Sequence, residues 1–231
     1  MSFLRVRKVL VFIALSGTCG SGVFAQATKK APSQEARRAE LAQVQELLAD
    51  PDPNLRLANM EAIVNSHDTT KLQLALRIVF HSDDPNMRAL GVRAYIASLN
   101  DITFDVQFPA AVQHQYEEAQ GDEDRMNALI KQHPYVGGFI SSGLRLRLIF
   151  SKYDMTKNTG VLADAKVVSV PGAFTVSGDR VTGSFTSALN TLGIAPCSVD
   201  FRPTTEASLR GSLVCDLRSL IPRLSISAPI F

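Results

Sequence analysis

Apolar side chains recur every three to four positions over residues 36–99, which is the spacing of one face of an α-helix. The pattern predicts four helices, at residues 36–49, 53–65, 69–81 and 85–99. Asp-Pro steps precede the second and fourth, since proline suits the first helical turn and an aspartate before it can cap free N–H groups. The third helix is apolar on nearly every side, so we expect it to be buried between neighbours.

One pentapeptide occurs twice in this region. Asp52-Pro53-Asn54-Leu55-Arg56 returns 32 residues later as Asp84-Pro85-Asn86-Met87-Arg88. A fixed period of this size is typical of stacked helical pairs, which present surfaces to partners. Residues 36–100 resemble the HEAT-like helical repeat family, in its short variety with an Asp-Pro-x-x-Arg opening.

The resemblance implies structural roles for six residues and no catalytic role. In such repeats the aspartate caps a helix and the arginine staples neighbouring units; the residues concerned here are Asp52, Pro53, Arg56, Asp84, Pro85 and Arg88. Two units fall below the roughly three that a helical stack usually needs. We therefore expect other parts of the chain to cover its ends.

The segment that follows carries mixed signals. Residues 101–109 alternate apolar and polar positions and predict a short extended piece. Residues 110–120 and 122–133 read as helices broken at Gly121, and a degenerate third pair is one interpretation. We place the end of the helical, HEAT-like domain, residues 36–138, at the Gly137-Gly138 step.

From Gly143 the hydrophobic period changes from 3.6 to 2, which predicts a second, β-stranded domain at residues 143–231. Strands are expected at 144–149 and 165–170, with hairpins turning around 177–179 and 203–206. About six strands would form an antiparallel sheet, either a sandwich or a meander. The predicted fold class is α+β.

The N-terminus has the features of a secretory signal. Arg5, Arg7 and Lys8 precede a seven-residue apolar run, and Val23-Phe24-Ala25 suits cleavage after residue 25. An uncleaved anchor and a lipid attached to Cys19 are the alternatives. Residues 26–35 are small and polar and read as a flexible leader. We expect a periplasmic or secreted protein with no transmembrane segment after cleavage.

Cleavage changes the charge of the chain. The full sequence has 24 basic and 22 acidic residues, and the signal removes three basic ones, which leaves 21 against 22 and a net charge of about −1. Such a chain lacks the basic surface expected of a nucleic-acid binder. No nucleic-acid partner is predicted.

Cleavage also leaves an even pair of cysteines, Cys197 and Cys215, which predicts a disulfide in an exported chain. In a hairpin centred on Glu206 the two positions lie directly opposite each other. Closing a loop of this length contributes about 3 kcal/mol. Two unpaired buried thiols are the alternative.

No motif in the sequence predicts a catalytic, cofactor or metal site. The four histidines, His67, His81, His114 and His133, lack the spacing of a helical metal pair. Ser141-Ser142-Gly143 is better explained as a linker than as a hydrolase nucleophile. Arg145, Arg147 and Lys152 read as a solvated face, with a patch for an anionic glycan or lipid headgroup as the sharper alternative.

These patterns favour a non-enzymatic binding or scaffold protein that docks another envelope protein through its helical-repeat surface. Surface residues near the repeat, Asn59, Asn65 and Arg93, are weak candidates for that contact. One alternative is a periplasmic carrier of a small lipid or glycan, with an apolar cavity lined by Phe174, Val181, Phe185 and Phe201. The other alternative is an unrecognised hydrolase with polar groups converging in a cleft.

Overall fold

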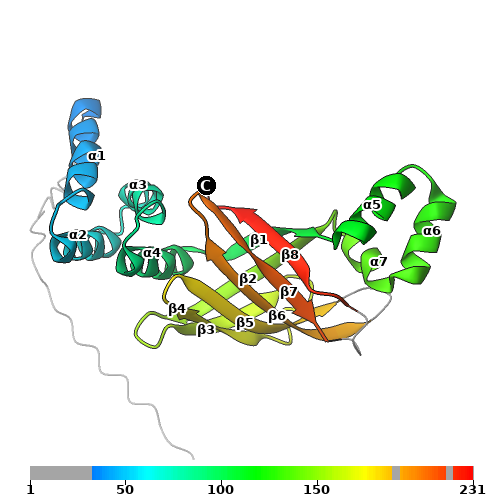
Figure 1. The fold of residues 1–231 in the computed structure, drawn as a ribbon. Coiled ribbons are helices and arrows are strands. Elements are labelled where there is room, and N and C mark those ends of the chain that lie inside the picture. The colour runs from blue at the N-terminus through cyan, green and yellow to red at the C-terminus, as the bar shows by residue number, and fades with distance from the viewer. Residues whose placement is uncertain (1–32, 189–192, 217–220, 231) are drawn as a thin grey trace, which may run out of the picture.

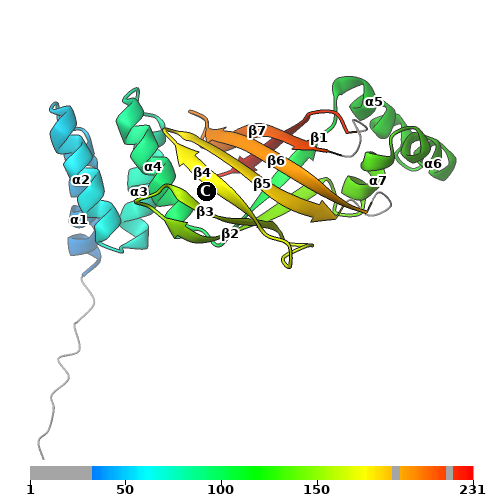
Figure 2. The same cartoon turned by 90° about the horizontal axis from the view of Figure 1, so that it is seen from below.

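The computed structural model describes residues 33–188, 193–216 and 221–230. The chain is α+β: a closed eight-stranded antiparallel barrel separates two helical parts (Figure 1). Helices α1–α4 lie at one end of the barrel and α5–α7 at the opposite end, and both views show this arrangement (Figure 1 and Figure 2). The predicted signal peptide, Cys19 and residues 26–32 of the leader lie outside the described residues.

Helices α1–α4, which we call the helical stack, lie within about two residues of the predicted bounds. They are α1 Gln34–Leu48, α2 Pro53–Asn65, α3 Thr69–Phe80 and α4 Pro85–Ser98. The stack has two layers, because α1 packs against α3 and α2 packs against α4. Helix α3 buries Ala75, Leu76, Val79 and Phe80, while its other apolar side chains are only partly covered.

The strands run in sequence order around the barrel. They are β1 Asp101–Gln107, β2 Arg145–Asp154, β3 Thr159–Asp164, β4 Gly172–Ser177, β5 Arg180–Ala188, β6 Ile194–Pro203, β7 Ser208–Cys215 and β8 Leu224–Pro229. Each pairs with the next, and β1 also pairs with β8, with Val106 opposite Ile226. The antiparallel sheet is as predicted, but it is neither a sandwich nor an open meander, because β1 closes it.

Strand β1 lies within the predicted helical domain, residues 36–138, but belongs to the barrel. Residues 101–107 belong to the barrel, and α5 Ala110–Ala119, α6 Glu123–Gln132 and α7 Pro134–Ile140 are inserted between β1 and β2. A boundary at residue 138 therefore does not separate helices from strands. Helices α5 and α6 lie across the barrel from the helical stack, so they do not add a third pair to it (Figure 2).

Helix α7 forms where the sequence predicts a break. Pro134 occupies the first turn, where it is tolerated. Tyr135 and Phe139 are buried against the ring of Phe108, with centroids 5.9 and 6.4 Å from it. This tertiary burial outweighs the low helix propensity of Gly137 and Gly138.

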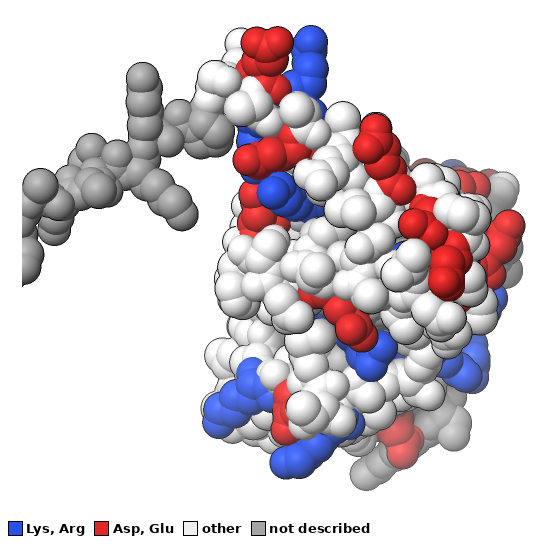
Figure 3. All heavy atoms as spheres, turned by 90° about the vertical axis from the view of Figure 1, so that its left-hand side faces the viewer, with Lys and Arg blue, Asp and Glu red and all other residues white. Residues whose placement is uncertain are grey.

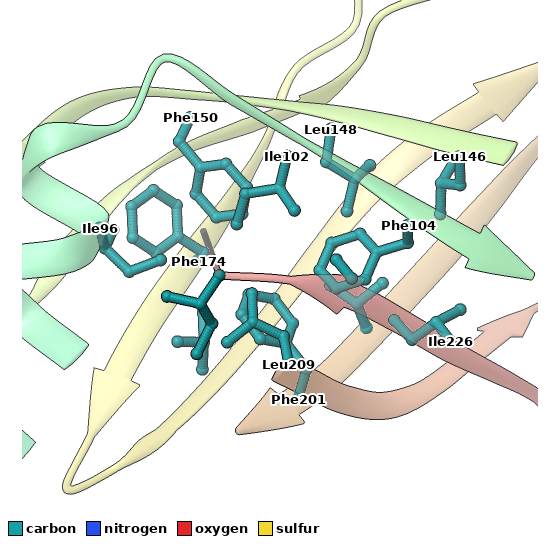
Figure 4. Close-up of a cluster of buried hydrophobic side chains, with 14 of the residues drawn as sticks. Ile96, Ile102, Phe104, Leu146, Leu148, Phe150, Phe174, Phe201, Leu209 and Ile226 are labelled. Atoms are coloured by element: carbon teal, nitrogen blue, oxygen red, sulfur yellow. The ribbon is translucent and has the colours of Figure 1, made fainter. Parts of the chain in front are cut away.

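The barrel interior is filled by side chains from alternating strand positions (Figure 4). The ring of Phe104 lies 5.0 Å from that of Phe201, and the ring of Phe150 lies 5.1 Å from that of Phe174. Phe174, Val181, Phe185 and Phe201 are each buried to 3% exposure or less. Of the four, only Phe201 borders a pocket in the described part, and that pocket is lined mainly by charged residues such as Arg180, Asp200 and Arg210. The apolar interior cavity expected of a carrier is therefore not observed among the pockets of the described residues.

The strand predicted at 165–170 is wrong. Strand β3 ends at Asp164, whose carboxylate accepts a hydrogen bond from the backbone N–H of Lys166 at 2.9 Å. The N–H of Val167 donates to the carbonyl of Asp164, also at 2.9 Å, which turns the chain. Val168 and Val170 consequently lie in a loop, 56% and 46% exposed.

The predicted disulfide is confirmed. Cys197 and Cys215 are directly opposite in the β6–β7 ladder and their sulfurs are 2.00 Å apart. Both residues are buried in the barrel core. The disulfide therefore cross-links two neighbouring strands near the end of the barrel where β6 begins and β7 ends.

Candidate functional site

The two Asp-Pro steps begin helices α2 and α4 in the same way. The Asp52 carboxylate accepts a hydrogen bond from the N–H of Asn54 at 2.8 Å. The Asp84 carboxylate accepts from the N–H groups of Asn86 at 2.9 Å and Met87 at 3.4 Å. Each aspartate thus satisfies a helix N-terminus that has no internal partner.

The two repeat arginines also adopt a common geometry. Arg56 Nη1 donates to the carbonyl of Asp50 and Arg88 Nη1 donates to the carbonyl of Ser82, both at 2.8 Å. In each case the acceptor lies six residues before the arginine, within the connection that precedes its helix. This bond fixes the guanidinium beside its own helix start and leaves its remaining N–H groups for another element.

Each arginine also makes a contact with an element further along the molecule. Arg56 Nη2 lies 3.5 Å from Asp84 Oδ2, so the first helical pair is joined to the second. Arg88 Nε lies 3.3 Å from Asp179 Oδ2, in the turn between β4 and β5. The barrel hairpin therefore supplies the carboxylate that a third helical pair would supply.

Helix α4 also packs against the barrel through apolar contacts. Ile96 is 1% exposed and lies beside Phe150 and Phe174 at the end of the barrel core (Figure 4). Contacts between α4 and both β2 and β4 continue this interface. The barrel thus closes the C-terminal end of the helical stack.

The opposite end of the stack is open. Leu55 on α2 is 51% exposed, and Ala58 and Ala62 on the same helix face are exposed as well. We call these three residues the open face. Their counterparts 32 positions later are buried; these are Met87, Leu90 and Ala94, at 2%, 5% and 2% exposure. The view onto this end of the molecule shows uncharged surface interspersed with acidic and basic groups (Figure 3).

Asp52 stands beside the open face without an arginine. Its carboxylate is exposed and its only hydrogen bond among the described residues is the one from Asn54. No ion pair to Asp52 occurs in the described part of the chain, whereas Asp84 and Asp179 each pair with an arginine from the preceding helical pair. The series of arginine–aspartate contacts therefore begins with an unfilled position.

Local electrostatics keep the charged groups of the stack ionised. The Arg37 guanidinium forms two hydrogen bonds of 2.8 Å with Asp68 and holds the pKa of that carboxyl well below its usual range. The N–H of Asn86 lowers the pKa of Asp84, and the N–H of Met87 and the Arg56 guanidinium lower it further. These aspartates are anions at neutral pH.

The arginines of β2 do not form a free basic stripe. Arg147 makes two hydrogen bonds to Asp101, at 2.8 and 3.1 Å, and Arg145 lies 3.7 Å from Asp105. Both aspartates are on β1, the neighbouring strand. The pairing neutralises most of the positive charge that the β2 sequence presents.

A pocket of about 330 Å³ lies where α7 meets the barrel. Its lining includes Phe139 and Leu146, with Arg147 and Lys166 among its charged residues. Asp164 also lines it and is 2% exposed; its carboxylate accepts a 2.5 Å hydrogen bond from the Ser187 hydroxyl. This bond ties the end of β3 to β5.

The remaining predicted candidates do not gather at one place. His67 lies between α2 and α3, His81 caps α3, His114 is on α5 and His133 precedes α7. Within residues 33–188, 193–216 and 221–230 no three metal-ligating side chains form a group. Neither Ser187 nor Asp164 is hydrogen-bonded to a histidine in that part of the chain.

The weaker surface candidates have structural surroundings. Asn59 donates its side-chain N–H to the carbonyl of Leu47, at the end of α1, at 2.9 Å. Arg93 is partly buried on α4, and its Nε has no hydrogen-bond partner among the residues that the structure describes. Asn65 is the exposed last residue of α2.

Sequence reasoning missed the role of Asp179. The residue belongs to a Ser-Gly-Asp turn whose composition is explained by the hairpin alone. Its distance of 91 residues from Arg88 gives no local signal of the contact.

No helix in the described part of the chain has the length and hydrophobicity needed to cross a membrane. Comparisons with protein-family models, with curated proteins and with solved structures find no match to this chain.

Proposed function

We propose that this chain is an exported, non-enzymatic binding or scaffold protein that docks another envelope protein through the open end of its helical stack. The observation that carries the proposal is the asymmetry of the stack. Its C-terminal end is closed by the barrel through Arg88 and Asp179, while the equivalent surface of the first pair is uncovered. An exposed helix face whose counterpart on α4 is buried by stacking fits a partner-binding role.

Several further features support this assignment. The resemblance of the stack to HEAT-like repeats favours binding over catalysis. The Cys197–Cys215 disulfide agrees with export to an oxidising compartment. The filled barrel core fits a rigid platform that holds the stack in place.

The test is site-specific photo-crosslinking of the mature protein in its native envelope. A photoreactive residue is placed at Ala58 on the open face, and the matched control carries it at Gln115, an exposed residue of α5 at the far end of the barrel. We expect a stoichiometric protein adduct from position 58 only. Equal labelling from both positions, or no protein adduct from position 58, would contradict the proposal.

A second candidate function is the carriage of a small amphiphilic lipid or glycan fragment. The pocket between α7 and the barrel favours it, because barrel mouths often hold ligands and because this pocket combines apolar walls with Arg147, Lys166 and buried Asp164. Native mass spectrometry of the mature protein purified from its source tests it. A bound small molecule that disappears in a Thr103→Trp variant, which narrows the pocket, would support the carrier.

A further inference from the structure

We propose that the open face of α2 receives a helix from a partner protein and that this helix places an arginine against Asp52. The inference rests on the proposed docking function and names the chemistry of the partner. It follows from the arginine–aspartate contact, which occurs at Asp84 and at Asp179 but has no arginine at Asp52 among the described residues.

The direction of the arginine–aspartate contact shows that an arginine is the group missing at Asp52. In both completed examples the arginine comes from the N-terminal element and the carboxylate from the next one along the molecule: Arg56 to Asp84, then Arg88 to Asp179. Asp52 is the first carboxylate of this series, and the element that would hold its arginine is not within the described residues. A partner that continues the stack must therefore bring a cation to this position.

The shape of the open face agrees with a helix as the occupant. Leu55, Ala58 and Ala62 lie on one side of α2, and the two alanines allow another backbone to approach closely. Their counterparts on α4 are buried within the stack, where α4 packs against α2 and α3. The equivalent positions on α2 can thus pack against a partner helix at the usual 8–10 Å separation of packed helices.

The charge of the first pair favours a basic partner over a second copy of this chain. Residues 34–65 contain six acidic and three basic residues, a net charge of −3, so two such ends brought together would repel. A second copy also could not add head to tail, because its Arg56 and Arg88 are already paired. Self-association through this end is an outcome that would overturn the proposal.

A tandem duplication tests the chemistry without knowledge of the partner. The extended full-length chain carries a second copy of residues 37–68 directly after the first, which keeps the 32-residue period and gives one copy of Asp52 an arginine neighbour. Asp52→Asn is the informative substitution, because asparagine caps a helix as well as aspartate does but carries no charge. It is made in the original chain and in the inner copy of the extended chain.

We expect the extended chain to unfold in one transition with a higher urea midpoint than the original. Asp52→Asn should raise the unfolding equilibrium constant of the extended chain by about threefold or more, the size of a half-exposed ion pair, while changing that of the original chain little. The matched control is Asp124→Asn, an exposed acid on α6, which should be neutral in both chains. Equal effects of Asp52→Asn in both chains, or separate unfolding of the added unit, would overturn the arginine contact.

A charge exchange distinguishes failure of this inference from failure of the proposed function. If position 58 cross-links to a partner, the contacting arginine is identified by mapping the adduct, and Asp52→Arg should weaken binding of the purified partner at least tenfold. The reverse substitution in the partner should restore binding to the Asp52→Arg chain. If the partner binds the wild-type and Asp52→Arg chains equally well, the docking function is supported and the arginine contact with Asp52 is refuted. A cross-link to a second copy of this chain would refute both claims.

Discussion

Arg88 Nε lies 3.3 Å from Asp179 Oδ2, across a sequence separation of 91 residues, in the arrangement that Arg56 and Asp84 adopt within the helical stack. A β-hairpin turn thus occupies the position of a helix start. The barrel is in this respect the last unit of the stack, which explains how two helical pairs remain folded without a third.

The first prediction concerns this contact. Arg88→Met should cost about 1–2 kcal/mol of unfolding free energy, because it loses both the Asp179 contact and the hydrogen bond to the carbonyl of Ser82. Asp179→Asn alone should cost at most about 1 kcal/mol, since about a third of each side chain is exposed. Urea unfolding of the two single variants and the double variant should give a coupling of about 0.5 kcal/mol; strict additivity would show that the pair does not interact.

The second prediction concerns Ile96, which joins α4 to the barrel core. Ile96→Ala should lower the unfolding free energy by about 2–4 kcal/mol, because it leaves a cavity beside Phe150 and Phe174. The wild-type helices and barrel should unfold together, and the variant should separate the two transitions when followed by far- and near-ultraviolet circular dichroism. Ala97→Ser, at an exposed neighbour, is the control. A single unchanged transition in Ile96→Ala would contradict the coupling.

The third prediction is a pH dependence. Arg37 holds the pKa of Asp68 below its unfolded value, which is about 3.9. The stabilisation is therefore complete above that pH and is lost as the pH falls towards the folded-state pKa. Thermal unfolding between pH 5 and pH 2.5 should show a smaller loss of Tm in Asp68→Asn than in the wild type. Parallel curves for the two proteins would refute the contribution of this pair.

The fourth prediction concerns the disulfide. The double substitution of Cys197 and Cys215 by alanine should cost about 3 kcal/mol, because the cross-link closes a loop with a sequence separation of 18. Alkylation of the unfolded, unreduced mature protein should leave its mass unchanged, and reduction should then expose two thiols. Two thiols that react without reductant would contradict the pairing.

Much of the helical stack follows from local signals. Asp52 and Asp84 are strong helix caps followed by proline, so the starts of α2 and α4 are predicted correctly to the residue. The β6–β7 register follows from a similar local cause, since a short hairpin turn fixes which residues are opposite, and Cys197 meets Cys215 as expected.

The errors arise where distant contacts decide the outcome. Strand β1 reads as a short extended piece inside a helical region, and only its pairing with β2 and β8 makes it part of a barrel. Helix α7 contains two glycines and forms because Tyr135 and Phe139 are buried against Phe108. The loop at 165–170 has β-branched residues, but the hydrogen bonds of Asp164 turn the chain there.

The sequence by itself determines the helix starts, the 32-residue repeat, the strand alternation and the cysteine pairing, because each depends on residues close together in the chain. The tertiary structure alone decides that the sheet closes, that α5–α7 lie at the far end of the barrel, and that Asp179 completes the contact of Arg88. It also decides which face of the repeat stays bare. Burial depends on which distant segments meet, and the sequence of the open face on α2 gives no sign that the matching face on α4 is covered while this one is not.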